Sequence, residues 1–160
     1  MASKEKGGET KYKKASVMVK LLIFIAVLSA ILAIAIIAFN PPLYFANINN
    51  TKRNDDIIKI LNAIHQYAAD NKGVFPPEMP APGTEPVKIA KMGADICHDL
   101  VPKYLTTMPT DPTGANGGIN SECSGNYDTG YTVSVGAYDR ITITAPMTQE
   151  PLSAIITATR

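Results

Sequence analysis

The residue types that most often carry chemistry are sparse in this chain. Its 160 residues contain two cysteines, Cys97 and Cys123, and two histidines, of which His98 directly follows Cys97. A histidine beside a cysteine can in principle activate the thiol as a nucleophile. A metal site formed by Cys97, His98 and Cys123 would lack the usual ligand spacing. We therefore predict a Cys97–Cys123 disulfide, as expected for an even pair in an oxidising compartment, and two buried free thiols are the alternative.

A second group of candidate ligands lies in a glycine-rich stretch. Carboxylate and amide oxygens on flexible backbone are the ligands that calcium prefers. The group comprises Asp111, Asn116, Asn120, Glu122, Asn126 and Asp128. Their spacing does not match the EF-hand pattern, and turn formation explains these residue types equally well. We therefore predict no metal site and no cofactor.

Motifs of the common enzyme classes are absent from the sequence. It contains no G-x-S-x-G, no H-E-x-x-H, no P-loop and no G-x-G-x-x-G. His65 falls on the polar side of an expected helix, where a histidine is usually solvated. We therefore predict that the protein is not an enzyme and has no small-molecule substrate.

The dominant feature of the sequence is an apolar run from Val17 to Phe39, interrupted by Lys20 and Ser29. As a helix this run would span roughly 34 Å, which is enough to cross a bilayer. It is longer than the apolar part of a cleaved signal, and the following Asn40-Pro41-Pro42 lacks the pattern of a cut site. We predict one transmembrane helix over residues 17–39, with the lipid bilayer as a partner.

The formal charge is distributed unevenly along the chain. Residues 1–20 carry six lysines and two glutamates, a net charge of +4, and the remainder carries nine basic and twelve acidic residues, a net charge of −3, which together give +1. By the positive-inside rule, the basic leader 1–16 lies in the cytoplasm and residues 40–160 form an extracytoplasmic domain. The leader is expected to be disordered. The mild acidity of the domain argues against nucleic acid as a partner.

The extracytoplasmic part reads as a helix followed by short strands. Apolar residues at helical spacing predict an amphipathic helix over about 43–71, with Ile57, Leu61, Ile64 and Ala68 on its buried side. A proline-rich loop over 75–86 follows, and alternating residues predict a hairpin over about 130–146. The predicted fold class is α+β: a long N-terminal helix, with a transmembrane half, a proline break and an amphipathic half, packed on a small antiparallel sheet.

Smaller features complete this prediction. We expect strands only near the C-terminus and a short helix within 95–105, capped by Asp95. Asp55 and Asp56 come at the N-terminal end of the most regular part of this helical pattern, where the helix dipole favours acidic groups. The tail 147–160, with Leu152, Ile155 and Ile156, fits either a last strand or a short helix.

Three segments, in order, resemble the type IV pilin and type II secretion pseudopilin family. Asp55 to Pro76, DDIIKILNAIHQYAADNKGVFP, is similar to the family's D-x-x-x-I-x-x-A-I-x-x-Y-x-x-D-N-x-G-x-x-P helix. Leu100 to Pro112, LVPKYLTTMPTDP, resembles its L-x-P-x-Y-L-x-x-x-P-x-D-P segment. Gly130-Tyr131 and the hairpin ending RITITAP at Pro146 form the third match.

The resemblance implies a membrane-anchored structural subunit of a type IV pilus or a type II secretion-like filament, and other pilin-like subunits as partners. Its helices would assemble through apolar contacts and small residues that allow close approach. These small residues are Ala26, Ser29, Ala30 and Ala33. The alternative is a membrane-tethered binding domain that uses the same scaffold without assembling.

The resemblance also places a prepilin processing site between Ala15 and Ser16. Family precursors carry Gly before the cut, Phe after it and Glu five residues into the mature chain, whereas this chain has Ala15, Ser16 and Lys20. The family's glutamate is thought to neutralise the new N-terminal amine of a neighbouring subunit, and a lysine there would repel it. Either the leader is retained, or this subunit occupies a place where that neutralisation is not required.

Overall fold

The computed structural model describes residues 6–39, 41–114, 123, 125–151 and 155–160. For residues 6–15 and Phe39 it describes the backbone alone. The chain divides into two compact units, Met1–Tyr44 and Phe45–Arg160.

The first unit consists mainly of one helix, α1 (Lys6–Phe39), which has 34 residues. It begins inside the basic leader, so the expectation of a disordered leader is wrong for the leader's described part. The run of Ala, Leu, Ile and Val gives the helix good intrinsic propensity and no interior proline. The predicted proline break falls on Asn40, which lies outside the described residues, and α2 (Pro41–Asp70) begins directly after it. Two prolines suit a helix start, because the first turn has no internal acceptor for their missing N–H groups.

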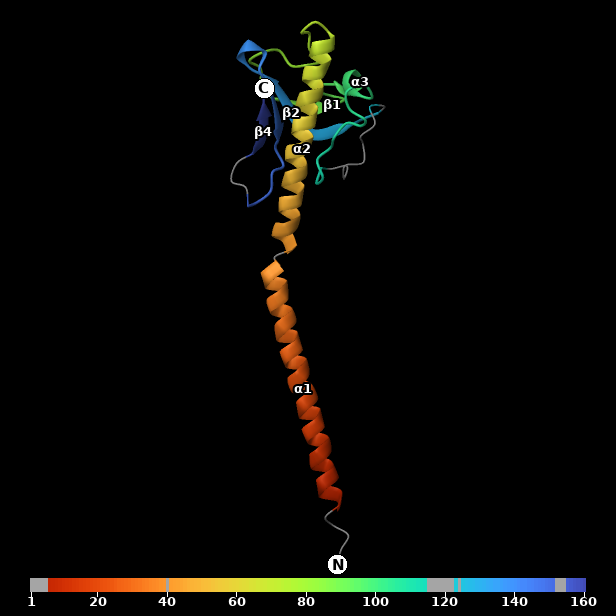
Figure 1. The fold of residues 1–160 in the computed structure, drawn as a ribbon, viewed down its shortest axis with the longest axis vertical. Coiled ribbons are helices and arrows are strands. Elements are labelled where there is room, and N and C mark those ends of the chain that lie inside the picture. The colour runs from red at the N-terminus through yellow and green to blue at the C-terminus, as the bar shows by residue number, and fades with distance from the viewer. Residues whose placement is uncertain (1–5, 40, 115–122, 124, 152–154) are drawn as a thin grey trace, which may run out of the picture. The chain divides into compact units, whose positions relative to one another are not determined.

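The second unit contains most of α2, the short helix α3 (Cys97–Leu100) and one sheet (Figure 1). The strands are β1 (Val87–Ala90), β2 (Asp128–Val135), β3 (Ile141–Ala145) and β4 (Ile156–Thr159). Their order across the sheet is β1-β2-β3-β4, and each neighbouring pair is antiparallel. A long helix on a four-stranded antiparallel sheet is the predicted α+β arrangement.

The predicted hairpin is present, and its register follows the alternation of the sequence. Val133 pairs with Ile143 and Val135 with Ile141. Every second residue of β2 and β3 is buried, beginning at Thr129 and Ile141. The two strands are joined through a short 3₁₀ turn, η1 (Ala137–Asp139).

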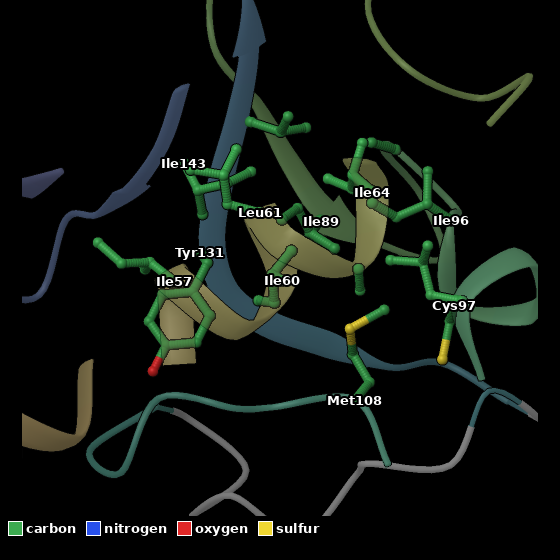
Figure 2. Packing of buried hydrophobic residues seen from close by; sticks show 14 of the residues in the cluster. Ile57, Ile60, Leu61, Ile64, Ile89, Ile96, Cys97, Met108, Tyr131 and Ile143 are labelled. Carbon is green, nitrogen blue, oxygen red and sulfur yellow. The ribbon is translucent and has the colours of Figure 1, made fainter. Parts of the chain in front are cut away.

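The hydrophobic core lies between α2 and one face of the sheet (Figure 2). Ile57, Ile60 and Ile64 are fully buried, and Leu61 and Ala68 nearly so, which confirms the predicted apolar side of α2. The sheet contributes Tyr131, Ile141 and Ile143 among others, and the loops contribute Ile96 and Met108. Burying a side chain of this size stabilises the fold by about 1.5–3 kcal/mol, so these contacts dominate the stability of the unit.

Several sequence predictions are wrong in detail. A strand was not expected before the C-terminal region, yet β1 follows the proline-rich loop directly and forms an edge of the sheet. The helix expected within 95–105 is only α3, and its N-cap residue is Ile96 rather than Asp95, with no capping hydrogen bond from a side chain. α2 begins at Pro41, close to the predicted residue 43, so Asp55 and Asp56 lie in its middle, where the helix dipole gives them no stabilisation. Of the two alternatives for the tail, the strand is confirmed as β4, while Leu152 lies outside the described residues.

A disulfide joins Cys97 to Cys123, a separation of 26 residues. Cys97 is fully buried at the start of α3, and Cys123 is nearly buried. The bond excludes the two alternatives of free thiols and of a metal-binding pair. It holds the chain before β2 against α3, at the edge of the core.

Replacing both cysteines by alanine should lower the unfolding free energy of residues 45–160. The expected loss is about 3 kcal/mol, because the unfolded chain regains the entropy of an open loop. Urea unfolding followed by circular dichroism measures it, and wild type treated with a reductant is the matched control. An unchanged transition midpoint in both samples would contradict the role given to this bond.

Candidate functional site

The surface of α1 is the most unusual feature of the first unit. From Ser16 to Ala38 every residue is exposed except Ala35, which is half-buried. The exposed side chains include large apolar groups such as Ile34 and Ile37. Each such side chain left exposed to water lacks the roughly 1.5–3 kcal/mol of stabilising free energy that its burial would give. In the part of the chain that the structure describes, one helical stretch is long and apolar enough to cross a membrane, and α1 supplies its apolar part.

The small residues predicted to pack helices lie on one side of α1. Ala26, Ala30 and Ala33 are three or four positions apart, and Ser29 lies beside them, so all four share a face of about 100°. The Ser29 hydroxyl donates a 2.9 Å hydrogen bond to the Ala26 carbonyl oxygen. Its polarity is therefore satisfied within its own helix, and this face can approach another helix closely.

The predicted processing position lies within the helix. The backbone of Ala15 and Ser16 belongs to α1, Ser16 is exposed, and the side chain of Ala15 is outside the described residues. Lys20 is exposed one turn further along. Processing between Ala15 and Ser16 stays a prediction.

In the second unit, the buried side of α2 changes from apolar to polar toward its N-terminal half. Asn50, Arg53 and Asp56 are all buried and are spaced by three residues, so they lie on the side that Ile57 and Ile60 continue. Sequence reasoning missed the burial of these three residues because polar and charged residues on a helix are usually solvated.

Arg53 is the centre of this buried polar network. Its Nε donates to Asp111 Oδ2 at 2.6 Å and its Nη2 donates to Asp111 Oδ1 at 3.0 Å. The remaining donors reach Thr113 Oγ1 at 2.6 Å, Asn50 Oδ1 at 2.9 Å and Gln149 Oε1 at 3.3 Å. A guanidinium has five N–H groups, so every donor has a partner. Both ions of the Arg53–Asp111 pair are completely buried.

The carboxylate of Asp111 is held equally firmly. Burial by itself raises the pKa of Asp111, but hydrogen bonds from Arg53 and Thr113 outweigh it, and the pKa lies below its ordinary value. The backbone N–H of Asp111 also donates to the Thr129 carbonyl oxygen at 2.8 Å. Gly130 makes this approach sterically feasible, because a Cβ there would lie 2.8 Å from Asp111 Cβ, and its φ of +78° also favours glycine.

A second part of the network surrounds Asp56. Tyr131 donates its hydroxyl to Asp56 Oδ2 at 2.9 Å, and Lys52 pairs with the same oxygen. Lys52 also donates to the Thr110 carbonyl oxygen at 3.0 Å. Burial, followed by the negative charge of Asp56, raises the pKa of Tyr131 well above its usual range, so its hydroxyl stays protonated and donates. Asp56 therefore fastens β2 to α2 across the core.

The connection between β3 and β4 is attached to α2 by Gln149. Asn50 Nδ2 donates to the Gln149 carbonyl oxygen at 2.6 Å, and the Gln149 N–H donates to Asn50 Oδ1 at 3.0 Å. Asn49 Nδ2 adds a bond to Gln149 Oε1 at 2.8 Å. Three segments distant in the sequence, near residues 50, 111 and 149, thus meet at one face of α2.

The other residues singled out from the sequence are dispersed or already engaged. His98 is exposed, and Cys97 is bonded to Cys123, so the thiol-activation hypothesis is wrong. Of the oxygen-rich group, Asp111 binds Arg53, and Asp128 accepts a 2.9 Å bond from the Gly130 N–H. Asn116, Asn120 and Glu122 lie outside the described residues. Within the described part, no three acidic, histidine or cysteine side chains gather as a metal site.

His65 differs from its prediction as a solvated residue. Its side chain is only partly exposed and its ring meets Phe75 edge-on, with centroids 6.1 Å apart. Its Nε2 atom is buried without a hydrogen-bond partner. Burial, and then the positive charge of Arg160, lower the pKa of His65.

Comparisons with protein-family models, with curated proteins and with solved structures find no match to this chain.

The buried pair predicts a large and non-additive effect of mutation. Arg53→Met or Asp111→Asn should each cost about 3–5 kcal/mol at pH 7, because each leaves one ion buried without its partner. The double variant should cost less than the sum of the two. Urea unfolding of residues 45–160 measures all three. Lys88→Met, which removes the exposed Lys88–Asp128 pair, is the matched control and should cost at most about 1 kcal/mol.

Urea unfolding at lower pH tests whether ionised Asp111 stabilises the fold. Because its pKa is lowered on folding, Asp111 stabilises the fold above its unfolded pKa of about 3.9, and this stabilisation is lost as the pH falls through the folded value. The difference between wild type and Asp111→Asn should therefore shrink from pH 7 toward pH 2. A constant difference, or additive single variants, would contradict the assigned pairing.

Proposed function

We propose that α1 anchors this protein in a lipid bilayer, and that the protein is a non-enzymatic structural subunit of a membrane-based filament of the type IV pilus or type II secretion kind. The observation that carries the proposal is the exposure of nearly every apolar side chain from Val17 to Ala38. Such a surface requires lipid or other apolar helices around it.

Two observations support an extracytoplasmic second unit. The lysines of the leader favour a cytoplasmic N-terminus. The Cys97–Cys123 disulfide is typical of domains in an oxidising compartment. With the leader inside, a single crossing by α1 places residues 45–160 on that oxidising side.

The polar residues that meet in the second unit support a structural role. Arg53, Asp111, Asp56 and Tyr131 are buried, Arg53 is bonded to Asp111, and Tyr131 is bonded to Asp56. Groups committed in this way hold loops and strands on α2. A rigid unit of this kind is suited to repeated packing, with the small-residue face of α1 as the contact between neighbouring subunits.

A membrane-tethered binding domain is the second candidate. A hollow beside His65, lined by two arginines, favours it. The two functions are compatible, because the hollow belongs to the second unit and the proposed packing face belongs to α1.

The small-residue face predicts which substitution weakens assembly. Ala33→Leu places a bulky side chain on the contact face and should raise the dissociation constant of self-association in mild detergent roughly tenfold. Analytical ultracentrifugation measures it. Ala35→Leu is the matched control, since Ala35 lies about 200° around the helix from Ala33.

Two results would count against this proposal. One is a wild-type protein that remains monomeric at every concentration and binds no other membrane-anchored subunit. The other is an equal loss of association in Ala33→Leu and Ala35→Leu, which would show that this face is not the contact.

A further inference from the structure

A hollow of about 630 Å³ lies in the second unit, away from the buried polar network. It is lined by the C-terminal half of α2, the β2–β3 connection and the residue after β4. Its lining residues are His65, Ala137, Tyr138, Asp139, Arg140 and Arg160. Sites for small organic ligands usually measure about 300–1,000 Å³, so this space suits a ring-sized molecule.

The two guanidinium groups of the hollow lack acidic partners. Within the described part of the chain, the Arg140 side chain makes no hydrogen bond or ion pair. Arg160 donates one hydrogen bond from Nη1, to Asn62 Oδ1 at 3.1 Å, and forms no ion pair with any described carboxylate. Arg53 shows the contrast, because all five of its donors are used. The hollow therefore offers unused donors in the geometry that binds carboxylates.

A third polar residue, His65, lies in the wall of the hollow. The Nε2 atom of His65 is buried and unbonded. An unmet buried polar atom is costly and rare in native structures. Burial and the nearby positive charge of Arg160 lower the pKa of His65, which favours the neutral ring in this wall.

The rim of the hollow carries an aromatic ring and a carboxylate. Tyr138 is completely exposed, with a relative exposure of 102%. A tyrosine ring in this position offers a flat apolar face together with a polar tip. Asp139, beside it, is exposed and can accept hydrogen bonds from hydroxyl groups.

We propose that this hollow binds an acidic sugar, a hexuronate unit. The sugar carboxylate would lie between Arg140 and Arg160. Its hydroxyl groups would reach the Asp139 carboxylate, Tyr138 would cover one face of the ring, and His65 would lie in the wall behind it.

The mixture of groups favours this ligand over simpler ones. An inorganic oxyanion would use the arginines but would fill little of the space and would leave the Tyr138 ring and the Asp139 carboxylate without a contact. A neutral sugar would leave both guanidinium groups unpaired. A hexuronate matches the charges, the hydroxyl-binding groups and the size together.

The test is a titration of the full-length, ¹⁵N-labelled protein in detergent micelles, followed by NMR. The probe is the methyl glycoside of glucuronate, and the methyl glycoside of glucose and inorganic phosphate are the comparison ligands. We expect shifts at residues 138–140, Arg160 and His65, with a dissociation constant on the order of 1 mM for glucuronate. Binding of the other two ligands should be roughly tenfold weaker or more.

Variants of the lining residues sharpen the test. Arg140→Gln and Arg160→Gln should each weaken glucuronate binding roughly tenfold. Lys59→Gln removes one exposed positive charge elsewhere on α2 and should leave binding unchanged. Tyr138→Asn removes the ring but keeps a residue type that tolerates the local φ of 59°, and it should weaken glucuronate binding.

Unchanged spectra away from the hollow show that each variant is folded, so a loss of binding can be assigned to the site. The proposal is overturned if glucose or phosphate binds as tightly as glucuronate, if Lys59→Gln weakens binding as much as Arg140→Gln, or if glucuronate produces no shifts at the hollow. These outcomes are independent of assembly through α1, so they leave the proposed structural function to its own experiment.

Discussion

The rest of the structure depends on one constraint, the need to cover the apolar surface of α1. A helix that exposes isoleucine, leucine and valine on all sides is unfavourable in water but satisfies its own backbone hydrogen bonds in lipid. A bilayer would therefore cover the apolar side chains that α1 exposes in the described residues. The second unit in turn has to pack on α2, which begins at Pro41, soon after the apolar stretch of α1 ends.

The second unit meets those demands with two kinds of contact on one side of α2. Ile57, Ile60 and Ile64 bury apolar area against the sheet (Figure 2). In the N-terminal half of α2, Arg53 lies on the same side and makes hydrogen bonds to Asp111 and Gln149, which belong to two irregular segments. A buried ion pair of this kind contributes little net stability compared with an apolar core, but it accepts only one arrangement of donors and acceptors. Its value here is to fix irregular segments that have few apolar residues of their own.

The sequence alone reveals the parts of this fold that are periodic. The helical spacing of Ile57, Leu61 and Ile64 and the alternation in β2 and β3 follow directly from which faces are buried. β1 escapes prediction because it is four residues long and follows a run of prolines. The Arg53–Asp111 pair escapes it because the partners are 58 residues apart, and nothing local distinguishes a buried arginine from a solvated one. The hollow likewise depends on residues from three distant segments, and His65 gives no sign of burial in the sequence.

The proposal that α1 crosses a bilayer is tested most directly by measuring how accessible a spin label on α1 is to lipid-soluble and water-soluble reagents. Because Cys97 and Cys123 are bonded, a single introduced cysteine can carry a nitroxide label, at Leu28→Cys in α1 or at Lys59→Cys on the exposed side of α2. In liposomes, the label at residue 28 should be accessible to oxygen and shielded from a water-soluble nickel complex, and the label at residue 59 should show the reverse. Equal access of the nickel complex to both labels would contradict a membrane-spanning α1.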